Sequence, residues 1–249
     1  MLRVFGKFLA LALAVSVITG AVYAADITTG MVGYWPLDGN AKDKSGKGND
    51  GTAVGSPQWV AGRIGQAVKL DGKTQRIDIP GFKLTTNTAT FATWLNGWKT
   101  DTWTGIMMSR GTATPNGIGF GDNDALHYTW NGDSTWQWHG GPVIPKDKWV
   151  MVAVAVEAKL ATAYTYTDAD GLKSAVNNAT HLSETIDKLQ IGFDNCCGNT
   201  RWFAGSVDEA VVYSRALTRD DILELATKGL AAAVGSSGKL ATTWGTIKQ

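Results

Sequence analysis

The chain has 249 residues, and its 23 lysines and arginines against 22 aspartates and glutamates give a formal net charge of +1. This near-neutral balance, with no basic stripe along the chain, argues against nucleic acid as a partner. Glycine (30 residues) and tryptophan (11 residues) are frequent, and a chain of this length suits one large β-sandwich or barrel.

Residues 1–24 have the organisation of a secretory signal peptide. Arg3 and Lys7 precede an apolar stretch at 8–18, and small residues lead to a predicted cleavage site after Ala24. The stretch is short for a membrane span, so we expect cleavage rather than an uncleaved anchor. The mature protein is then exported, extracellular or periplasmic, with no membrane span.

Short runs rich in β-branched and aromatic residues, separated by turn residues, predict an all-β fold. The predicted strands are 33–37, 66–70, 76–79, 88–96, 105–110, 117–121, 125–131, 134–140, 148–158, 161–167, 188–193 and 205–215. Asp-Ala-Asp-Gly at 168–171 predicts a hairpin turn, because Gly171 can take a positive φ.

The segment 217–229 predicts a short C-terminal helix. Thr218 is placed as the N-cap with Asp221 three residues on, apolar residues between 222 and 226 share one side, and Gly229 ends the helix. We therefore expect one domain over 26–228, followed by a peripheral extension at 229–249.

Five segments resemble, in chain order, those of laminin G-like, concanavalin A-like jelly-roll domains of bacterial secreted proteins. They are GYWPLDGNAKDKSGKGNDGT (33–52), GRIGQAVKLDG (62–72), IDIPG (77–81), FATWLN (91–96) and FAGSVDEAVVYSRALTRDDI (203–222). The resemblance implies two stacked antiparallel sheets, one of them concave, and often a structural calcium ion. Its usual ligands are glycans or other proteins, and it does not fix which, because one sandwich hosts many functions.

The resemblance also implies a calcium site formed by Asp38, Asn49 and Asp208, with backbone carbonyls near 45–48. Carboxylate, amide and carbonyl oxygens are the ligands that calcium takes. Strict alternation along 205–213 places Asp208 on an otherwise apolar face, where it needs a partner. The alternative is that Asp208 caps a loop through backbone N–H groups without a metal.

Catalytic patterns are weak. Glycosidases of this fold class carry Glu-x-Asp-x-x-Glu on one strand, and none of the four glutamates has that spacing. Alternation points Asp208 and Glu209 to opposite faces, and 184–187 is placed in a loop. The three histidines accompany no Gly-x-Ser-x-Gly motif and have no metal-ligand spacing. We therefore expect no enzymatic activity.

The tryptophans favour a binding function. Alternation along 125–131 puts Leu126, Tyr128 and Trp130 on one face and His127 and Thr129 on the other, and 134–140 is expected to complete a hairpin with this strand. Sugars present apolar C–H faces to aromatic rings and hydroxyls to polar side chains.

The residues predicted to bind ligand are Trp98, Trp103, Trp136, Trp138, His139 and Trp202. For the first four of these, a place in the core is an equal alternative, whereas Trp94 and Trp149 are assigned to the core. The sequence therefore predicts a secreted, non-catalytic module that recognises a glycan or glycoconjugate. A protein-binding adhesion module is the second hypothesis, and a glycoside hydrolase with atypical acids is the third.

Cys196 and Cys197 are adjacent and are the only cysteines. Neighbouring Cα atoms lie about 3.8 Å apart, so a bond between the two closes a strained ring. Export favours oxidation, and we predict a vicinal disulfide that stiffens the loop. Two free thiols and bonds to a second chain are alternatives, while two thiolates are too few for a typical zinc site.

Overall fold

The computed structural model of the chain describes residues 26–111, 115–130, 135, 138–196, 198 and 200–230. The predicted signal peptide and nearly all of the predicted extension lie outside these residues. Within them, no helix is long and apolar enough to cross a membrane.

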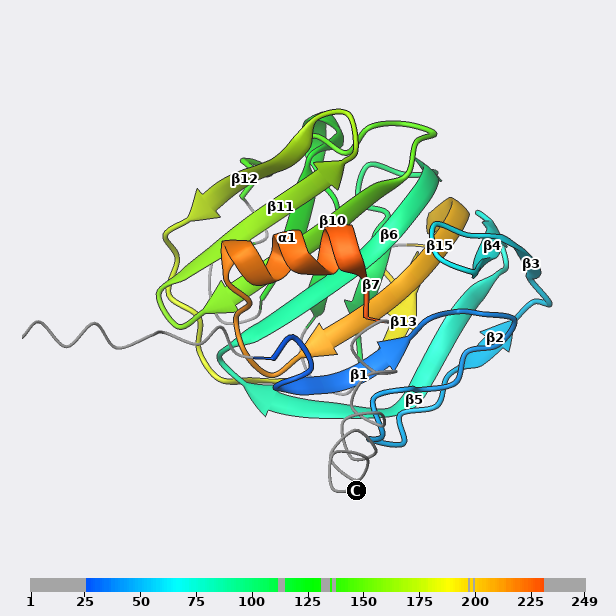
Figure 1. Cartoon of the computed structure of the whole chain (residues 1–249), viewed down its shortest axis with the longest axis horizontal. Helices are drawn as coiled ribbons and strands as arrows, with labels where there is room; N and C mark the ends of the chain where they lie inside the picture. Colours follow the sequence, from blue (N-terminus) through cyan, green and yellow to red (C-terminus); the bar gives the residue numbers. More distant parts are fainter. Residues whose placement is uncertain are drawn as a thin grey trace, which may run out of the picture.

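The described chain folds into two antiparallel sheets, which confirms the predicted all-β sandwich (Figure 1). The strands of the nine-stranded sheet are β1 (Met31–Trp35), β3 (Gln58–Ala61), β4 (Gln66–Asp71), β6 (Ala89–Lys99), β10 (Val150–Glu157), β11 (Leu160–Thr167), β12 (Gly171–Asn177), β14 (Phe193–Asp194) and β15 (Arg201–Tyr213). The strands of the six-stranded sheet are β2 (Thr52–Val54), β5 (Arg76–Thr86), β7 (Gly105–Ser109), β8 (Asn116–Phe120), β9 (Leu126–Thr129) and β13 (Glu184–Ile191). A short 3-10 turn, η1 (Asp122–Asp124), connects β8 to β9.

The order of the six-stranded sheet is β2-β5-β13-β7-β8-β9, and the main path of the larger sheet is β12-β11-β10-β6-β15-β4-β3. Strand β15 also pairs with β1 and β14. Apolar residues on the facing sides of both sheets form the main core, in which Trp35, Phe91 and Phe120 are almost fully buried.

A second apolar cluster covers the outer face of the nine-stranded sheet, beneath α1 (Arg219–Lys228). In Figure 1 the helix lies across β10 and β6. Trp94 belongs to this cluster and is 2% exposed, and the half-buried Trp149 packs against it, so both have the predicted core role.

The N-terminus of α1 confirms the predicted cap. The Thr218 hydroxyl accepts a hydrogen bond from the Asp221 amide, and the Asp221 carboxylate accepts one from the Thr218 amide. Ile222 and Leu225 are buried against the sheet, and Gly229 ends the helix with a φ of 67°. These two reciprocal bonds satisfy N–H groups that the first helical turn leaves unpaired.

The hairpin turn at 168–171 is also confirmed, with Gly171 at a φ of 68° between β11 and β12. The loop predicted at 184–187 is wrong, because these residues begin β13 and pair with β5. Their mixed polarity reflects a strand with one face on the core and the other toward solvent.

The alternation in β9 is confirmed: Leu126, Tyr128 and Trp130 lie in the core, whereas His127 and Thr129 point away from it. The hairpin with 134–140 is wrong, because the described residues of that segment are in no strand. Thr135 instead contacts the end of β9, since its Oγ1 accepts a hydrogen bond from the Trp130 amide at 2.8 Å.

Strand β15 has a β-bulge after Asp208, where Glu209 takes a positive φ of 53°. A bulge inserts one extra residue and shifts the alternation that follows it. Val207 therefore lies in the same inter-sheet core as Val212, and the strict alternation predicted for 205–213 is wrong.

The bulge also corrects the predicted orientation of two adjacent carboxylates. Asp208 pairs with Trp94, which lies on the outer face of the nine-stranded sheet. Glu209 accepts a hydrogen bond from the Tyr34 hydroxyl on that same face, at 2.8 Å. Asp208 and Glu209 are therefore on one side of the sheet rather than on opposite sides.

Candidate ligand-binding site

A pocket of about 300 Å³ lies on the outer face of the six-stranded sheet. His127 and Thr129 reach it from β9, because they alternate with core residues of that strand. Gly119 of β8 lies beside them and places no side chain on the floor of the pocket. Glycine inside a strand commonly marks a place where a ligand approaches the backbone.

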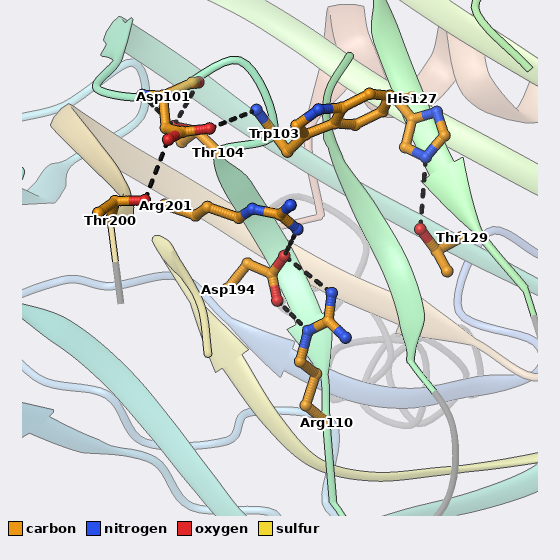
Figure 2. A network of polar contacts seen from close by, with 9 residues as sticks. All are labelled: Asp101, Trp103, Thr104, Arg110, His127, Thr129, Asp194, Thr200 and Arg201. Atoms are coloured by element: carbon orange, nitrogen blue, oxygen red, sulfur yellow. Dashed lines mark hydrogen bonds and ion pairs between the residues drawn. The ribbon is translucent and has the colours of Figure 1, made fainter. Parts of the chain in front are cut away.

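A buried carboxylate between two arginines forms one wall of this pocket. Asp194 is 2% exposed, and it accepts hydrogen bonds from Nε and Nη2 of Arg110 and, at 3.0 Å, from Nη1 of Arg201. Pairing of β14 with β15 places Asp194 opposite Arg201, and Arg110 follows the end of β7. Figure 2 shows both guanidinium groups converging on this carboxylate.

His127 forms the opposite wall as a neutral imidazole. Its Nδ1 lies 2.9 Å from the Trp138 carbonyl oxygen, and because a carbonyl only accepts, Nδ1 carries the proton. Nε2 then accepts a hydrogen bond from the Thr129 hydroxyl at 3.3 Å, which Figure 2 shows. Burial lowers the pKa of His127 to about 4, so the ring is uncharged at neutral pH.

Trp103 supplies an aromatic ring at the rim. The Asp101 carboxylate holds the preceding turn, accepting hydrogen bonds from the Trp103 amide at 3.2 Å and from the Thr200 hydroxyl at 3.0 Å. The Trp103 ring lies edge-on to His127 (Figure 2), with centroids 5.2 Å apart. The His139 ring centroid lies 5.4 Å from that of Trp103.

A second pocket of about 200 Å³ shares Arg110 with the first, so the two are neighbours on this face. Its lining includes Asp78, Lys188, Gln190 and Asn195. Gln190 donates a hydrogen bond to Asp78 at 2.8 Å, which fixes polar groups along β5 and β13. Together the two pockets provide space for a ligand larger than one small chemical group.

The structure brings together only part of the predicted aromatic set. Trp103 and His139 are in contact, and the His139 imidazole lies 3.7 Å from the Asp122 carboxylate. Trp138 is half-buried, packs edge-on against Tyr128 at 5.6 Å, and contributes its carbonyl oxygen to His127.

Two other predicted tryptophans have partly structural roles. The half-buried Trp98 packs against Phe120 at a centroid distance of 5.6 Å, and Trp202 stacks on Phe193 at 3.8 Å. Trp136 lies outside the described residues.

The sequence prediction missed Arg110, His127, Thr129, Asp194 and Arg201 as site residues. Alternation in β9 had already put His127 and Thr129 on one face away from the core, and that signal could have identified them. No local pattern links the other three, because strand pairing brings them together from separate parts of the chain.

The carboxylates of the predicted calcium site lie on the opposite side of the sandwich. Asp208 is fully buried: Oδ2 accepts a hydrogen bond from the Ile64 amide at 2.9 Å, and Oδ1 has no hydrogen-bond partner among the described residues. Burial raises the pKa of Asp208 to about 7, and the charge of Asp38 adds to the rise. Burial raises the pKa of Glu209 to about 7 as well, although its hydrogen bond from Tyr34 opposes this.

In both loops that were expected to supply calcium ligands, backbone amides donate hydrogen bonds to the aspartate carboxylates. Asp38 accepts a hydrogen bond from the Gln66 amide at 2.6 Å. Asp43 accepts bonds from the amides of Tyr34, Ser45 and Asn49, and thereby organises the glycine-rich loop.

The Asn49 side chain belongs to this second network, since it donates to the Val32 carbonyl oxygen at 2.8 Å. Within the described residues, no group of three or more His, Cys, Asp or Glu side chains is arranged to hold a metal ion.

Cys196 is half-buried just after β14, close in sequence to Asp194, and it is not a free thiol. Cys197 lies outside the described residues, so the vicinal disulfide stays a prediction.

The two stacked antiparallel sheets form a sandwich with the architecture of a concanavalin A-like jelly roll. The chain belongs to the concanavalin A-like lectin/glucanase superfamily, because residues 71–223 match its Laminin_G_3 family model. The predicted family and fold are thus confirmed. No protein of curated function is similar enough in sequence to match this chain.

Solved structures show the same fold at low identity. Domain 4 of AbnA, a GH43 extracellular arabinanase from Geobacillus stearothermophilus, in complex with arabinotriose, is 20% identical with a TM-score of 0.63, covering 79% of this chain and 98% of that chain. The binding domain of Paraclostridial Mosquitocidal Protein 1 is 15% identical, with a TM-score of 0.54 and coverages of 80% and 52%. Trypanosoma rangeli sialidase in complex with 2,3-difluorosialic acid is 16% identical, with a TM-score of 0.58, and this chain spans only 35% of it.

Proposed function

We propose that the protein is an exported, non-catalytic module that binds a glycan or glycoconjugate in the pocket on the outer face of the six-stranded sheet. The observation that carries this proposal is the combination of an aromatic rim, Trp103, with fixed polar groups from Arg110, Thr129 and Arg201 in one concave site. Ligand sites of this kind combine apolar surface with a few well-placed polar groups.

The geometry suits a sugar ring. The Trp103 indole provides an apolar face for sugar C–H groups. Thr129 donates its proton to His127, so its oxygen lone pairs stay available to a sugar hydroxyl. The structurally similar AbnA domain is in complex with arabinotriose, which supports a saccharide as the ligand class.

The same pocket gives little support to hydrolysis. Glycoside hydrolysis uses two carboxyl groups, one as the acid and one as the base or nucleophile. Asp194 is the carboxylate among the described lining residues, and both of its oxygens accept hydrogen bonds from arginine. It is therefore suited to positioning the guanidinium groups rather than to proton transfer.

A structural calcium ion is part of the proposal. Its support is the buried Asp208 Oδ1, for which the described part of the chain offers no hydrogen-bond partner, beside the carboxylates of Asp38 and Glu209. Asp208 and Asp38 would hold the ion, which would neutralise the charge of the buried Asp208 carboxylate. Asn49, the third predicted ligand, uses its side-chain N–H to donate a hydrogen bond, and its side-chain oxygen remains an acceptor that could bind calcium.

A protein partner is the second candidate, and one observation weighs against it. Protein-binding surfaces commonly present a contiguous apolar patch. The large apolar side chains that are most exposed in the described chain are Val143, Val176 and Leu182, and none of them lines either pocket on the outer face of the six-stranded sheet. Concavity and polarity there favour a saccharide.

Binding of the full chain to a panel of polysaccharides, measured by affinity electrophoresis, tests the function. Trp103→Ala should weaken binding about tenfold or more, whereas Trp103→Phe retains an aromatic face and should keep most of it. Thermal melting of both variants controls for folding. Unchanged binding in a folded Trp103→Ala protein would show that this pocket is not the saccharide site.

A further inference from the structure

The charged side chains of the pocket carry an excess of positive charge. Its described lining contains two guanidinium groups, Arg110 and Arg201, against one carboxylate, Asp194, which leaves a balance of one positive charge. His127 adds none at neutral pH, because its imidazole is uncharged. The lining of the adjoining pocket includes Lys188 and Asp78, and Asp78 is ion-paired with Arg76.

Both arginines have hydrogen-bonding capacity to spare. Within the described chain, Arg110 Nη1 and Arg201 Nε and Nη2 have no hydrogen-bond partner. A guanidinium group offers five N–H donors in a rigid plane and accepts none. These side chains are only 22% and 18% exposed, and both line the pocket.

Asp194 explains why two like charges can lie together in this site. Its carboxylate neutralises one guanidinium charge and fixes the planes of both groups, which a flexible lysine pair would not achieve. The second charge has no counterpart among the described lining residues. Two further carboxylates lie nearby but do not line the pocket: Asp101 accepts a hydrogen bond from the Trp103 amide, and Asp122 faces His139.

We infer that the preferred ligand is an acidic saccharide, whose carboxylate or sulfate group binds between Arg110 and Arg201 while a neighbouring sugar ring contacts Trp103. This inference rests on the proposed saccharide-binding function and adds the chemical class of the ligand. Charge-assisted, fork-shaped hydrogen bonds from arginine fit the planar oxygens of a carboxylate and the oxygens of a sulfate ester. A neutral sugar would leave the second guanidinium charge uncompensated.

Two matched pairs of polymers separate charge from sugar shape. The first pair is polygalacturonate and its methyl-esterified form, and the second is dextran sulfate and dextran. We expect the full chain to bind at least one acidic polymer about tenfold more tightly than its neutral partner, because a hydrogen bond to a charged group is that strong. Which pair shows the preference identifies the anion as carboxylate or sulfate.

Arg201→Gln removes the excess charge and leaves Asp194 paired with Arg110. We expect this variant to lose the preference for the acidic polymer. Lys69→Gln removes one positive charge from an exposed position on β4 and is the matched control. It should leave both affinities unchanged.

A salt titration of the unchanged protein tests the inference without a variant. Affinity for the acidic polymer should fall between 0.05 and 0.5 M NaCl, while affinity for its neutral partner stays constant.

Equal affinity for both members of each pair, or an equal loss in Lys69→Gln and Arg201→Gln, would overturn the inference and leave the saccharide-binding function intact. Absence of binding to all four polymers would contradict both.

Discussion

Protonation of His127 makes the stability of the fold depend on pH, because burial favours the neutral imidazole. Its proton on Nδ1 bonds to the Trp138 carbonyl, and its Nε2 accepts from Thr129. A second proton would place a positive charge in this buried site, and Arg201 adds a repulsive charge. Protonation therefore opposes the folded pocket.

The pKa of His127 is about 4 in the folded chain, below the ordinary value of about 6.5. Between these two values the unfolded chain binds more protons, so the free energy of unfolding decreases as pH falls through this window. We expect His127 to contribute a loss of about 2–3 kcal/mol between pH 7 and pH 4.5. Thermal melting of the unchanged protein and His127→Asn at both pH values measures it. An identical pH dependence in the two proteins would refute the assignment.

Asp208 allows a similarly direct test of calcium. If calcium binds beside its unpartnered Oδ1, a concentration a hundredfold above the dissociation constant stabilises the fold by about 2.7 kcal/mol. We expect the melting temperature to rise when calcium replaces a chelator, and Asp208→Asn to abolish the rise. Asp170→Asn, in the exposed turn between β11 and β12, should retain it. An unchanged melting curve in the unchanged protein would contradict the calcium proposal.

At the scale of elements, α1 shows what a local signal can specify. The reciprocal bonds of Thr218 and Asp221 were predictable because a capping box depends on residues three positions apart. Arg215 adds a contact that the local motif does not contain, donating to Asp221 at 2.8 Å.

We expect Thr218→Ala to lower the free energy of unfolding by about 1 kcal/mol, because the Asp221 amide loses its acceptor. Thr218→Ser keeps the hydroxyl and should stay within a few tenths of a kcal/mol. Urea denaturation with an unchanged m-value measures the difference. If alanine and serine behave alike, the cap does not stabilise the docked helix.

Strands were predictable where their alternation was regular and unpredictable where it was broken. In β9 the pattern gave the correct face for His127 and Thr129. In β15 the bulge at Glu209 reversed the expected orientation, because one extra residue changes the phase of the strand. The sequence has no glycine at this position to indicate the positive φ, so the bulge could not be predicted from the local sequence.

At the scale of the whole molecule, the two candidate sites lie on opposite outer faces of the sandwich. The saccharide pocket is on the six-stranded sheet, whereas Asp208 is on the outer face of the nine-stranded sheet beside Trp94. Residues that lie far apart in the sequence come together in one site only through the pairing of strands. This explains why Arg110 and Asp194, far apart in the chain, could not be joined by sequence reasoning.

The separation of the two faces predicts that they act independently. Stacked sheets are about 10 Å apart, and effects of substitutions beyond that range usually add within about 0.5 kcal/mol. Asp208→Asn should therefore change the melting temperature without altering affinity for the polymer that binds best, measured well below the melting transition. Trp103→Ala should change that affinity, and the double variant should show the sum of both effects. A loss of affinity in folded Asp208→Asn would instead show that the ion and the pocket are coupled through the core.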